Sequence, residues 1–423
     1  MRTSAIAAEP NLSNLQALQP VERALRSLLG DSRFLELPDA SVLNGKGSAL
    51  PDVLVSWSRS NDVEVELQKR GYIHQHRFAV LPSRLRARWL LPQRSGPSAV
   101  DGFEVYTPFS PGARFMKTLL TQIRATGWQG WARHTVLIAS KKPLAFETLV
   151  QNVTGETQLA FALSIGTPGL FQKLTIQVMS ADGKILCYAK LPLTNGASRR
   201  LVHEARLLQE LQRFPSLRSR VPHLLYDGAW SDGHVLIQTK LPGKPGPTRF
   251  SSVHDDFLQV LQECKPSMVP GRAVVRGVSR EWGRVAPQMG SRLQNLGRDA
   301  LRIATRELDA AQVLCGISHG DFAPWNTRMH RNNLFLFDWE SASLDAPCVW
   351  DRFHFLAQAE SLLGVKHSPS DSADPRLENR SLYLLYLLHS MAQLADEQPA
   401  EPVLAYRERE LSQHMSESSA AAD

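Results

Sequence analysis

The hydrophobic pattern of this chain changes near residue 246, and the change limits the folds that are open to it. Before that point, short apolar segments occur in the order three strands, one helix, two strands. Asp182-Gly183, a pair typical of hairpin turns, separates the second and third strands. The order predicts an antiparallel meander with a helix after its third strand. We expect the strands at 158–165, 174–179, 185–191, 224–229 and 234–239, and the helix at 197–214.

Beyond residue 246 the pattern is mainly helical. It predicts helices over 253–263, 290–311 and 381–396, and one short strand at 334–337. Strands in one part and helices in the next favour an α+β protein. We expect the strand-rich part to span 151–245 and the helical part 246–398. The last segment, 399–423, is polar and rich in Ser and Ala, which predicts a partly disordered tail.

Residues 1–150 form a third region, which we predict to be a small, separately folded α/β module. Strands are expected at 52–57, 77–81 and 135–139, with a helix at 115–124. This region holds 19 Lys and Arg against 12 Asp and Glu, whereas residues 151–423 hold 29 of each, so the whole net charge of +7 lies here.

Much of that excess lies in a basic stretch in which Arg84, Arg86 and Arg88 alternate with apolar residues, and we predict that they share one strand face. The simpler interpretation is a charged face in contact with water. The alternative is a site for an anionic ligand or an anionic membrane surface, which we favour over nucleic acid.

Several classes of protein are excluded by composition. The chain has no run of about 18 apolar residues, and its N-terminal apolar stretch is too short for a signal peptide. The four cysteines, Cys187, Cys264, Cys315 and Cys348, are far apart and form no CxxC pair, so the sequence signals neither a zinc site nor a disulfide framework. We expect a cytoplasmic protein.

The segments that indicate chemistry read HGDFAPWN at 319–326 and LFLFDWE at 334–340. Asp321 and Asn326 lie on a loop that Pro324 keeps from being helical, so a carboxylate and an amide can point into one cleft. Asp338 follows at the end of a strand. Phosphoryl transfer needs a group that positions the attacking hydroxyl and oxygen ligands for Mg²⁺. Asp321 fits the first requirement, and Asn326 and Asp338 fit the second.

These segments resemble the signature of the aminoglycoside phosphotransferase and choline kinase family, which is related to the protein kinases. The resemblance covers residues 158–395 and implies a two-lobed fold, with an antiparallel β small lobe and a mainly helical large lobe, here preceded by the α/β module. It also implies ATP and Mg²⁺ as cofactors. It matches Asp321 to the catalytic aspartate and Asn326 and Asp338 to the metal ligands. His319 would be structural, and Glu340 a second acidic group near the metals.

The resemblance extends to the strand-rich part. Lys190, on the third strand, matches the lysine that contacts the α- and β-phosphates, and Glu204, on the inserted helix, matches the glutamate that orients it. We expect the two side chains within about 4 Å of each other.

Gly166 and Gly169 fall in the loop that would cover the phosphates. This loop has two glycines and a proline rather than GxGxxG, which implies a looser cover. Asp351 matches the aspartate that braces the catalytic loop.

The sequence thus predicts an ATP-dependent phosphotransferase that acts on a hydroxyl of a small molecule. Residues 251–300 hold 7 basic and 5 acidic side chains, which disfavours a polycationic antibiotic and favours a sugar or a polysaccharide or glycolipid precursor. An aminoglycoside or amino-alcohol kinase remains an alternative. Another is a catalytically silent binding module. A protein kinase is disfavoured because no arginine precedes Asp321 and no DFG or APE element is present.

Overall fold

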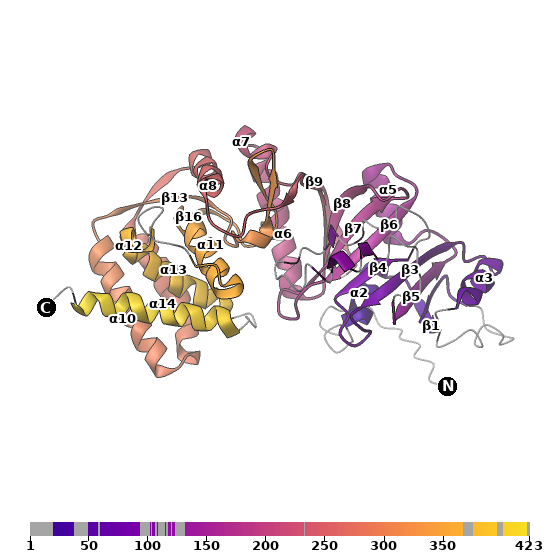
Figure 1. Ribbon diagram of the computed structural model, residues 1–423, viewed down its shortest axis with the longest axis horizontal. Helices are drawn as coiled ribbons and strands as arrows, with labels where there is room; N and C mark the ends of the chain where they lie inside the picture. The colour runs from indigo at the N-terminus through magenta and orange to yellow at the C-terminus, as the bar shows by residue number, and fades with distance from the viewer. Residues whose placement is uncertain are drawn as a thin grey trace. The chain divides into compact units, whose positions relative to one another are not determined.

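The computed structural model describes residues 20–37, 50–57, 60–93, 132–231, 233–366, 375–395 and 401–420, together with a few positions between 102 and 122. The chain divides into two compact units (Figure 1). The first unit is Met1–Ala205 with His223–Lys240, and the second unit is Arg206–Pro222 with Leu241–Asp423.

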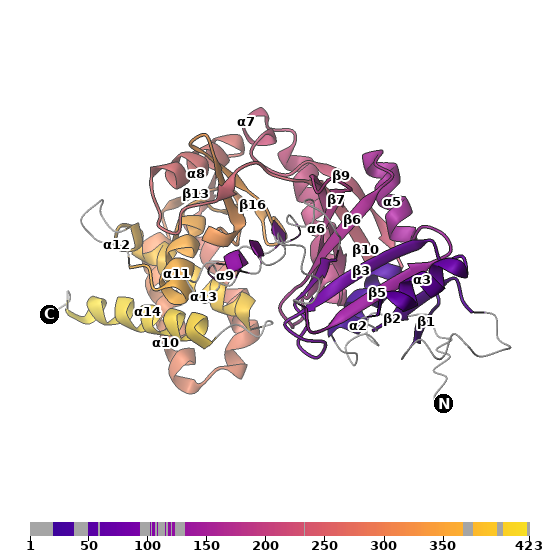
Figure 2. The ribbon, with the colours of Figure 1, turned by 45° about the vertical axis from the view of Figure 1, so that its right-hand side comes forward.

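The first unit is built on one ten-stranded sheet, most of whose strands are labelled in Figure 2. The strand order is β1-β2-β5-β3-β4-β6-β7-β8-β10-β9. The β1–β2 pair is parallel, and the other neighbours are antiparallel. The strands are β1 (Phe34–Leu37), β2 (Val53–Ser56), β3 (His74–Leu81), β4 (Trp89–Pro92), β5 (Thr135–Ser140), β6 (Leu159–Ile165), β7 (Lys173–Ser180), β8 (Ile185–Pro192), β9 (Leu224–Trp230) and β10 (Gly233–Thr239).

The predicted meander is confirmed. Strands β6, β7 and β8 are followed by the helix α6 (Asn195–Leu211) and then by β9 and β10, and the turn between β7 and β8 contains Asp182-Gly183. The strands predicted at 52–57, 77–81 and 135–139 correspond to β2, β3 and β5. Of the helix predicted at 115–124, residues 115, 117–119, 121 and 122 are described and are helical, and the other four lie outside the described residues.

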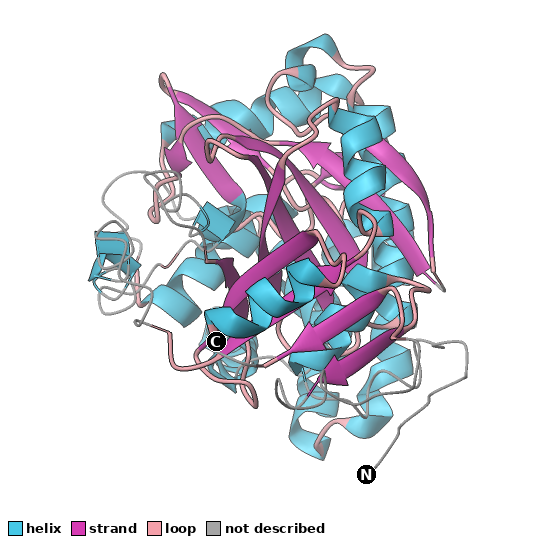
Figure 3. Cartoon of the chain, turned by 90° about the vertical axis from the view of Figure 1, so that its right-hand side faces the viewer, coloured by secondary structure: helices cyan, strands magenta, loops and turns pink. Residues whose placement is uncertain are grey.

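Helices cover both faces of this sheet, whose strands are magenta in Figure 3. Side chains alternate along each strand, so neighbours face opposite sides. On β2, Val55 packs in the cluster that contains α2 (Pro20–Leu29) and α5 (Ala145–Thr154), whereas Leu54 packs against α3 (Asn61–Lys69). The alternation therefore gives the sheet two separate hydrophobic layers.

The expectation of a separately folded N-terminal module is wrong, because one sheet and one core cross residue 150. Strand β4 pairs directly with β6, with Trp89 opposite Ser164 and Leu90 opposite Leu163. The largest hydrophobic cluster of the first unit contains Phe78 as well as residues of β6, β7 and β8. Local pattern could not reveal this, since the β4–β6 pairing joins segments that are far apart in the chain.

The second unit is mainly helical and carries two three-stranded sheets, β11-β14-β15 and β12-β13-β16, which together with the first unit confirms the α+β class. None of the helices in the described ranges combines the length and the apolarity needed to cross a lipid bilayer.

The elements of the second unit are α7 (Pro215–Arg218), β11 (Lys244–Pro245), α8 (Ser252–Cys264), β12 (Ser267–Pro270), α9 (Gly271–Val285), α10 (Ser291–Leu308), β13 (Gln312–Ser318), β14 (Thr327–His330), β15 (Asn333–Leu336), β16 (Ser343–Pro347), α11 (Trp350–Leu363), α12 (Pro375–Glu378), α13 (Arg380–Leu394) and α14 (Glu401–Ala420).

The C-terminal segment, predicted to be a partly disordered tail, is helical over its described residues. Residues 401–420 form the helix α14, and Val403, Tyr406, Arg407 and Leu411 are buried. These positions recur every three or four residues, so they share the face that packs on the second unit. The polar composition of the segment reflects both its opposite, exposed face and the buried polar side chains Arg407, Glu410 and His414.

Candidate active site

Lys190 lies on β8, inside the sheet of the first unit, opposite Thr175 of β7 and Leu236 of β10. Its Nζ atom is 2.6 Å from Oε1 and 2.8 Å from Oε2 of Glu204, which lies on α6. The side chains are 5% and 0% exposed. The predicted contact between these two residues is therefore confirmed.

This buried ion pair joins the strand β8 to the helix α6 at a high cost in desolvation free energy. Taking each charge out of water costs several kcal/mol, and well-packed apolar residues often stabilise a fold equally well. Both carboxylate oxygens of Glu204 accept hydrogen bonds from the ammonium of Lys190, and these two bonds fix the position of the ammonium. The pair holds the ammonium of Lys190 at a defined point on β8.

The loop between β6 and β7 needs both of its glycines. A Cβ atom on Gly166 would lie 2.8 Å from the carbonyl oxygen of Lys173, and Gly169 has φ of 150°, which favours glycine. Residues 167–170 are exposed. The loop is thus fixed at its first residue and open to solvent at its tip.

In the second unit, Asp351 at the start of α11 holds the loop that follows β13. Its Oδ1 accepts hydrogen bonds from the Ser318 hydroxyl at 3.0 Å and from the backbone N–H of Gly320 at 2.9 Å. Its Oδ2 accepts from the backbone N–H of His319 at 2.7 Å. The contacts expected of a bracing aspartate are confirmed, and they make the start of the loop rigid.

His319 is fully buried and neutral. Burial lowers the pKa of its imidazole, although nearby carboxylates act in the opposite direction. Nδ1 accepts from the backbone N–H of Asp321 at 3.2 Å, so Nε2 carries the proton and donates to the carbonyl oxygen of Phe337 at 3.0 Å. His319 therefore links the loop to the end of β15, in agreement with its predicted structural role.

Asp321 has a separate donor on each carboxylate oxygen. Nδ2 of Asn326 donates to Oδ2 at 2.8 Å and to the backbone carbonyl of Asp321 at 2.9 Å. Oδ1 lies 3.0 Å from Nε2 of His354, on α11. The Asp321 side chain is 35% exposed. Asp321 is thus oriented from two sides and still reachable by a substrate.

The hairpin of β14 and β15 brings the segments of Asn326 and Asp338 together. The backbone N–H of Phe337 donates to the carbonyl oxygen of Asn326 at 3.1 Å, next to Asp338. Carboxylate oxygens of Asp338 and Glu340 lie within 4.8 Å of each other. Because Nδ2 of Asn326 faces Asp321, its Oδ1 is the atom available to a cation. These oxygens are the donors that Mg²⁺ prefers, so the residues present fit that ion.

The contact of His354 with Asp321 was not predicted from the sequence. Nδ1 of His354 lies 3.3 Å from the hydroxyl of Tyr386 on α13, which accepts from Nη2 of the buried Arg407 on α14 at 3.2 Å. One signal was present: His354 follows Asp351 by three residues, so both share a face of α11. Tyr386 and Arg407 carried no such signal, since each lies on a different helix.

The three arginines of the basic stretch do not share a strand face, and this prediction is wrong. They precede β4 in a turn. Arg84 pairs with Glu36 at 2.7 Å and Glu22 at 3.4 Å. Arg88 donates to the β6–β7 loop, and Arg86 is exposed. Pairing of this kind removes the concentrated positive field that alternation along one face would have produced.

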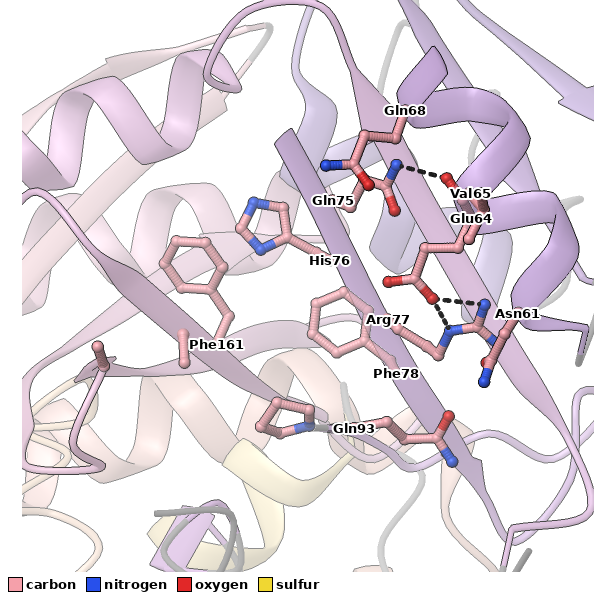
Figure 4. Close-up of a pocket in the computed structure, with 13 residues that line it drawn as sticks. Asn61, Glu64, Val65, Gln68, Gln75, His76, Arg77, Phe78, Gln93 and Phe161 are labelled. Atoms are coloured by element: carbon pink, nitrogen blue, oxygen red, sulfur yellow. Dashed lines mark hydrogen bonds and ion pairs between the residues drawn. The ribbon is translucent and has the colours of Figure 1, made fainter. Parts of the chain in front are cut away.

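A polar cavity of about 590 Å³ lies in the first unit, lined by residues of α3, β3 and β6 (Figure 4). Its charged side chains are paired: Nη2 of Arg77 is 2.8 Å from Oε2 of Glu64, and Nε2 of His76 is 3.3 Å from Oε2 of Glu147. Gln75 donates to two backbone carbonyls. Because these groups satisfy one another, the cavity indicates no particular ligand.

No family model matches the chain, and no curated protein matches it. Solved structures to which it is similar include a GDP complex of a mutant aminoglycoside 2'-phosphotransferase-IIIa, with 14% identity and a TM-score of 0.45 over 67% of this chain and 100% of that one. A thermostable mutant of aminoglycoside phosphotransferase APH(4)-Ia has 14% identity and a TM-score of 0.46 over 64% and 99%. Choline kinase from Cryptosporidium parvum has 10% identity and a TM-score of 0.39 over 62% and 90%. These values are too low to transfer a residue role, a substrate or an activity to this chain.

Proposed function

We propose that this chain is a phosphotransferase that moves the γ-phosphate of ATP to a hydroxyl of a small molecule. The observation that carries the proposal is Asp321, whose carboxylate is oriented by Asn326 and His354 while its side chain stays accessible. An oriented, accessible carboxylate beside oxygen ligands for a divalent cation is the arrangement that phosphoryl transfer requires.

The chemistry assigns a role to each group. The acceptor hydroxyl would donate a hydrogen bond to Asp321 and pass its proton to that carboxylate as the bond to phosphorus forms. Asn326 and Asp338 would hold Mg²⁺, which when bound offsets negative charge on the nucleotide phosphates. Lys190, held by Glu204, would contact the α- and β-phosphates, and the β6–β7 loop would cover them. A silent binding module is disfavoured because Lys190, Asp321, Asn326 and Asp338 are all retained.

We infer that the acceptor is neutral or anionic, such as a sugar or a polysaccharide or glycolipid precursor. Residues 251–300 carry more basic than acidic side chains, and Arg272, Arg276 and Arg280 are exposed on successive turns of α9. A polycationic acceptor would instead be attracted by an excess of carboxylates.

A panel of acceptors tests this function. Release of ADP from MgATP is measured with the full-length protein and sugars, sugar phosphates, amino alcohols or aminoglycosides, and products are identified by ³¹P NMR. We expect ADP release to rise well above the acceptor-free rate with a sugar-type hydroxyl compound. Stimulation only by aminoglycosides would refute the inferred acceptor class, and no stimulation by any member would count against the phosphotransferase itself.

A further inference from the structure

The carbonyl oxygen of Gly166, at the start of the β6–β7 loop, accepts two side-chain hydrogen bonds. Nη1 of Arg88 donates to it at 2.9 Å, and Nε2 of Gln172 donates to it at 2.9 Å. Nη2 of Arg88 also donates to the hydroxyl of Thr167 at 3.3 Å. One guanidinium thus holds two successive residues of the loop, and both lone pairs of the Gly166 carbonyl are used.

The second donor, Gln172, is itself held from the N-terminal region. Its side chain is 2% exposed, and its Oε1 accepts from Nη1 of Arg23, on α2, at 2.9 Å. The amide of Gln172 therefore has a partner at each end, and its orientation toward Gly166 is fixed. Burial lowers the pKa of Arg23, but a guanidinium stays charged at any physiological pH.

The sheet determines where Arg88 stands. It immediately precedes β4, and its carbonyl oxygen accepts the backbone N–H of Ile165, the last residue of β6, at 2.8 Å. Trp89, the next residue, is opposite Ser164. The pairing of β4 with β6 therefore brings the guanidinium of Arg88 to the loop.

We propose that the N-terminal part of the first unit braces the phosphate-covering loop, with Arg88 and Arg23 as positioning residues. Arg88 acts on Gly166 and Thr167 directly, and Arg23 acts on Gly166 through Gln172. This inference rests on the proposed function, because it takes the β6–β7 loop as the one that covers the nucleotide.

The need for a brace follows from the composition of the loop. Glycine-rich loops let backbone N–H groups approach phosphates closely, but this loop has only Gly166 and Gly169 and contains Pro168. With fewer glycines, fewer backbone conformations let the N–H groups of the loop face a phosphate, so holding the loop in such a conformation beforehand avoids an ordering cost on binding. Arg23 and Arg88 thus act on the nucleotide loop rather than by attracting an anionic acceptor.

Hydrogen–deuterium exchange and nucleotide binding in the full-length protein test the brace. The variants are Arg88→Ala, Arg88→Lys and Arg23→Lys, with Arg86→Ala as the matched control, since Arg86 is an exposed arginine of the same turn. Arg88→Lys keeps the charge and the aliphatic stem but cannot bridge two acceptors, so it serves if Arg88→Ala fails to fold. Exchange is followed in peptides that cover residues 166–173, and the dissociation constant is measured for Mg²⁺ with the non-hydrolysable analogue AMP-PNP.

We expect Arg88→Ala and Arg88→Lys to exchange faster over 166–173 and to bind Mg-AMP-PNP about tenfold more weakly, as when the competent loop conformation falls to about a tenth of the population. Arg23→Lys should show a smaller change of the same sign, and Arg86→Ala should match wild type. Wild-type exchange over 166–173 in Arg88→Lys would overturn the brace. If the wild-type protein binds no AMP-PNP, the proposed function fails, while the exchange result still decides whether the loop is braced.

Discussion

Asp321 has two oriented oxygens, and each depends on a different neighbour. Asn326 belongs to the same loop, whereas His354 belongs to α11 and is backed by Tyr386 of α13. We expect His354→Ala to lower kcat about tenfold, the effect of losing one hydrogen bond to a charged group, and to leave the dissociation constant for Mg-AMP-PNP unchanged. The exposed His330 provides the control, as His330→Ala should change neither quantity. A change in nucleotide affinity without a change in kcat would contradict a positioning role for His354.

Neutral His319 makes the stability of the protein depend on pH. Its pKa is lowered by burial in the folded state and is near 6.5 in the unfolded state, so below pH 6.5 the unfolded chain binds the proton more readily. Its contribution is complete above that pH and is lost as the pH falls toward the lowered pKa. The free energy of unfolding should therefore fall between pH 7.5 and 5.5 by more in wild type than in a variant with no titrating group at this position. Urea unfolding at both pH values should show this difference between wild type and His319→Gln. An equal pH dependence of the free energy of unfolding in the two proteins would exclude the assignment of His319 as a buried neutral imidazole.

At the scale of single residues, the sequence identified side chains by type, order and local spacing. Asp321, Asn326 and Asp338 were singled out in this way, because they lie on a predicted loop and at the end of a predicted strand, whereas Lys190 was singled out by the family resemblance. His354 shares a face of α11 with Asp351, which was its one signal, whereas Arg407 takes part only through contacts between helices that are distant in the chain. Single-sequence spacing holds no information about such contacts.

The helix α14 is the element for which composition was most misleading. Arg407 is fully buried, and its Nε donates to the hydroxyl of Ser390 at 2.9 Å. From the sequence alone, such a buried arginine cannot be distinguished from an exposed polar residue of a tail. Because short apolar runs are a local signal, eight of the ten strands of the first unit were predicted, and β1 and β4 were not. The partner of α14, in contrast, is a set of helices.

A core substitution in α14 tests its role as part of the fold. Leu411 is fully buried and belongs to the main cluster of the second unit. We expect Leu411→Ala to lower the free energy of unfolding by about 3 kcal/mol, as a large-to-small change in a core does. Ala405, on the exposed face of the same helix, gives the comparison, and Ala405→Ser should stay within about 0.5 kcal/mol of wild type. Equal stability of both variants would show that α14 does not pack in solution.

At the scale of the whole molecule, the ten-stranded sheet joins the described residues of 20–205 and of 223–240 in one compact unit. A fragment of residues 151–423 would lose β4, exposing the edge of β6, and would uncover the cluster that Leu25, Phe78 and Phe146 complete. An exposed apolar edge strand promotes aggregation. We expect this fragment to aggregate, whereas a chain that begins at residue 20 should unfold cooperatively like the full-length protein. A soluble 151–423 fragment with a single unfolding transition would contradict the continuity of the core.

The catalytic assignment is tested most directly by comparing turnover with nucleotide binding in Asp321→Asn and Asp338→Asn, using an acceptor that wild type phosphorylates. Asp321→Asn keeps the shape of the side chain but removes the base, so turnover should fall by about 10² to 10⁴ while Mg-AMP-PNP binds as in wild type. Asp338→Asn should instead lose Mg²⁺-dependent nucleotide binding. Turnover by Asp321→Asn within twofold of wild type would contradict the assignment of Asp321 as the catalytic base.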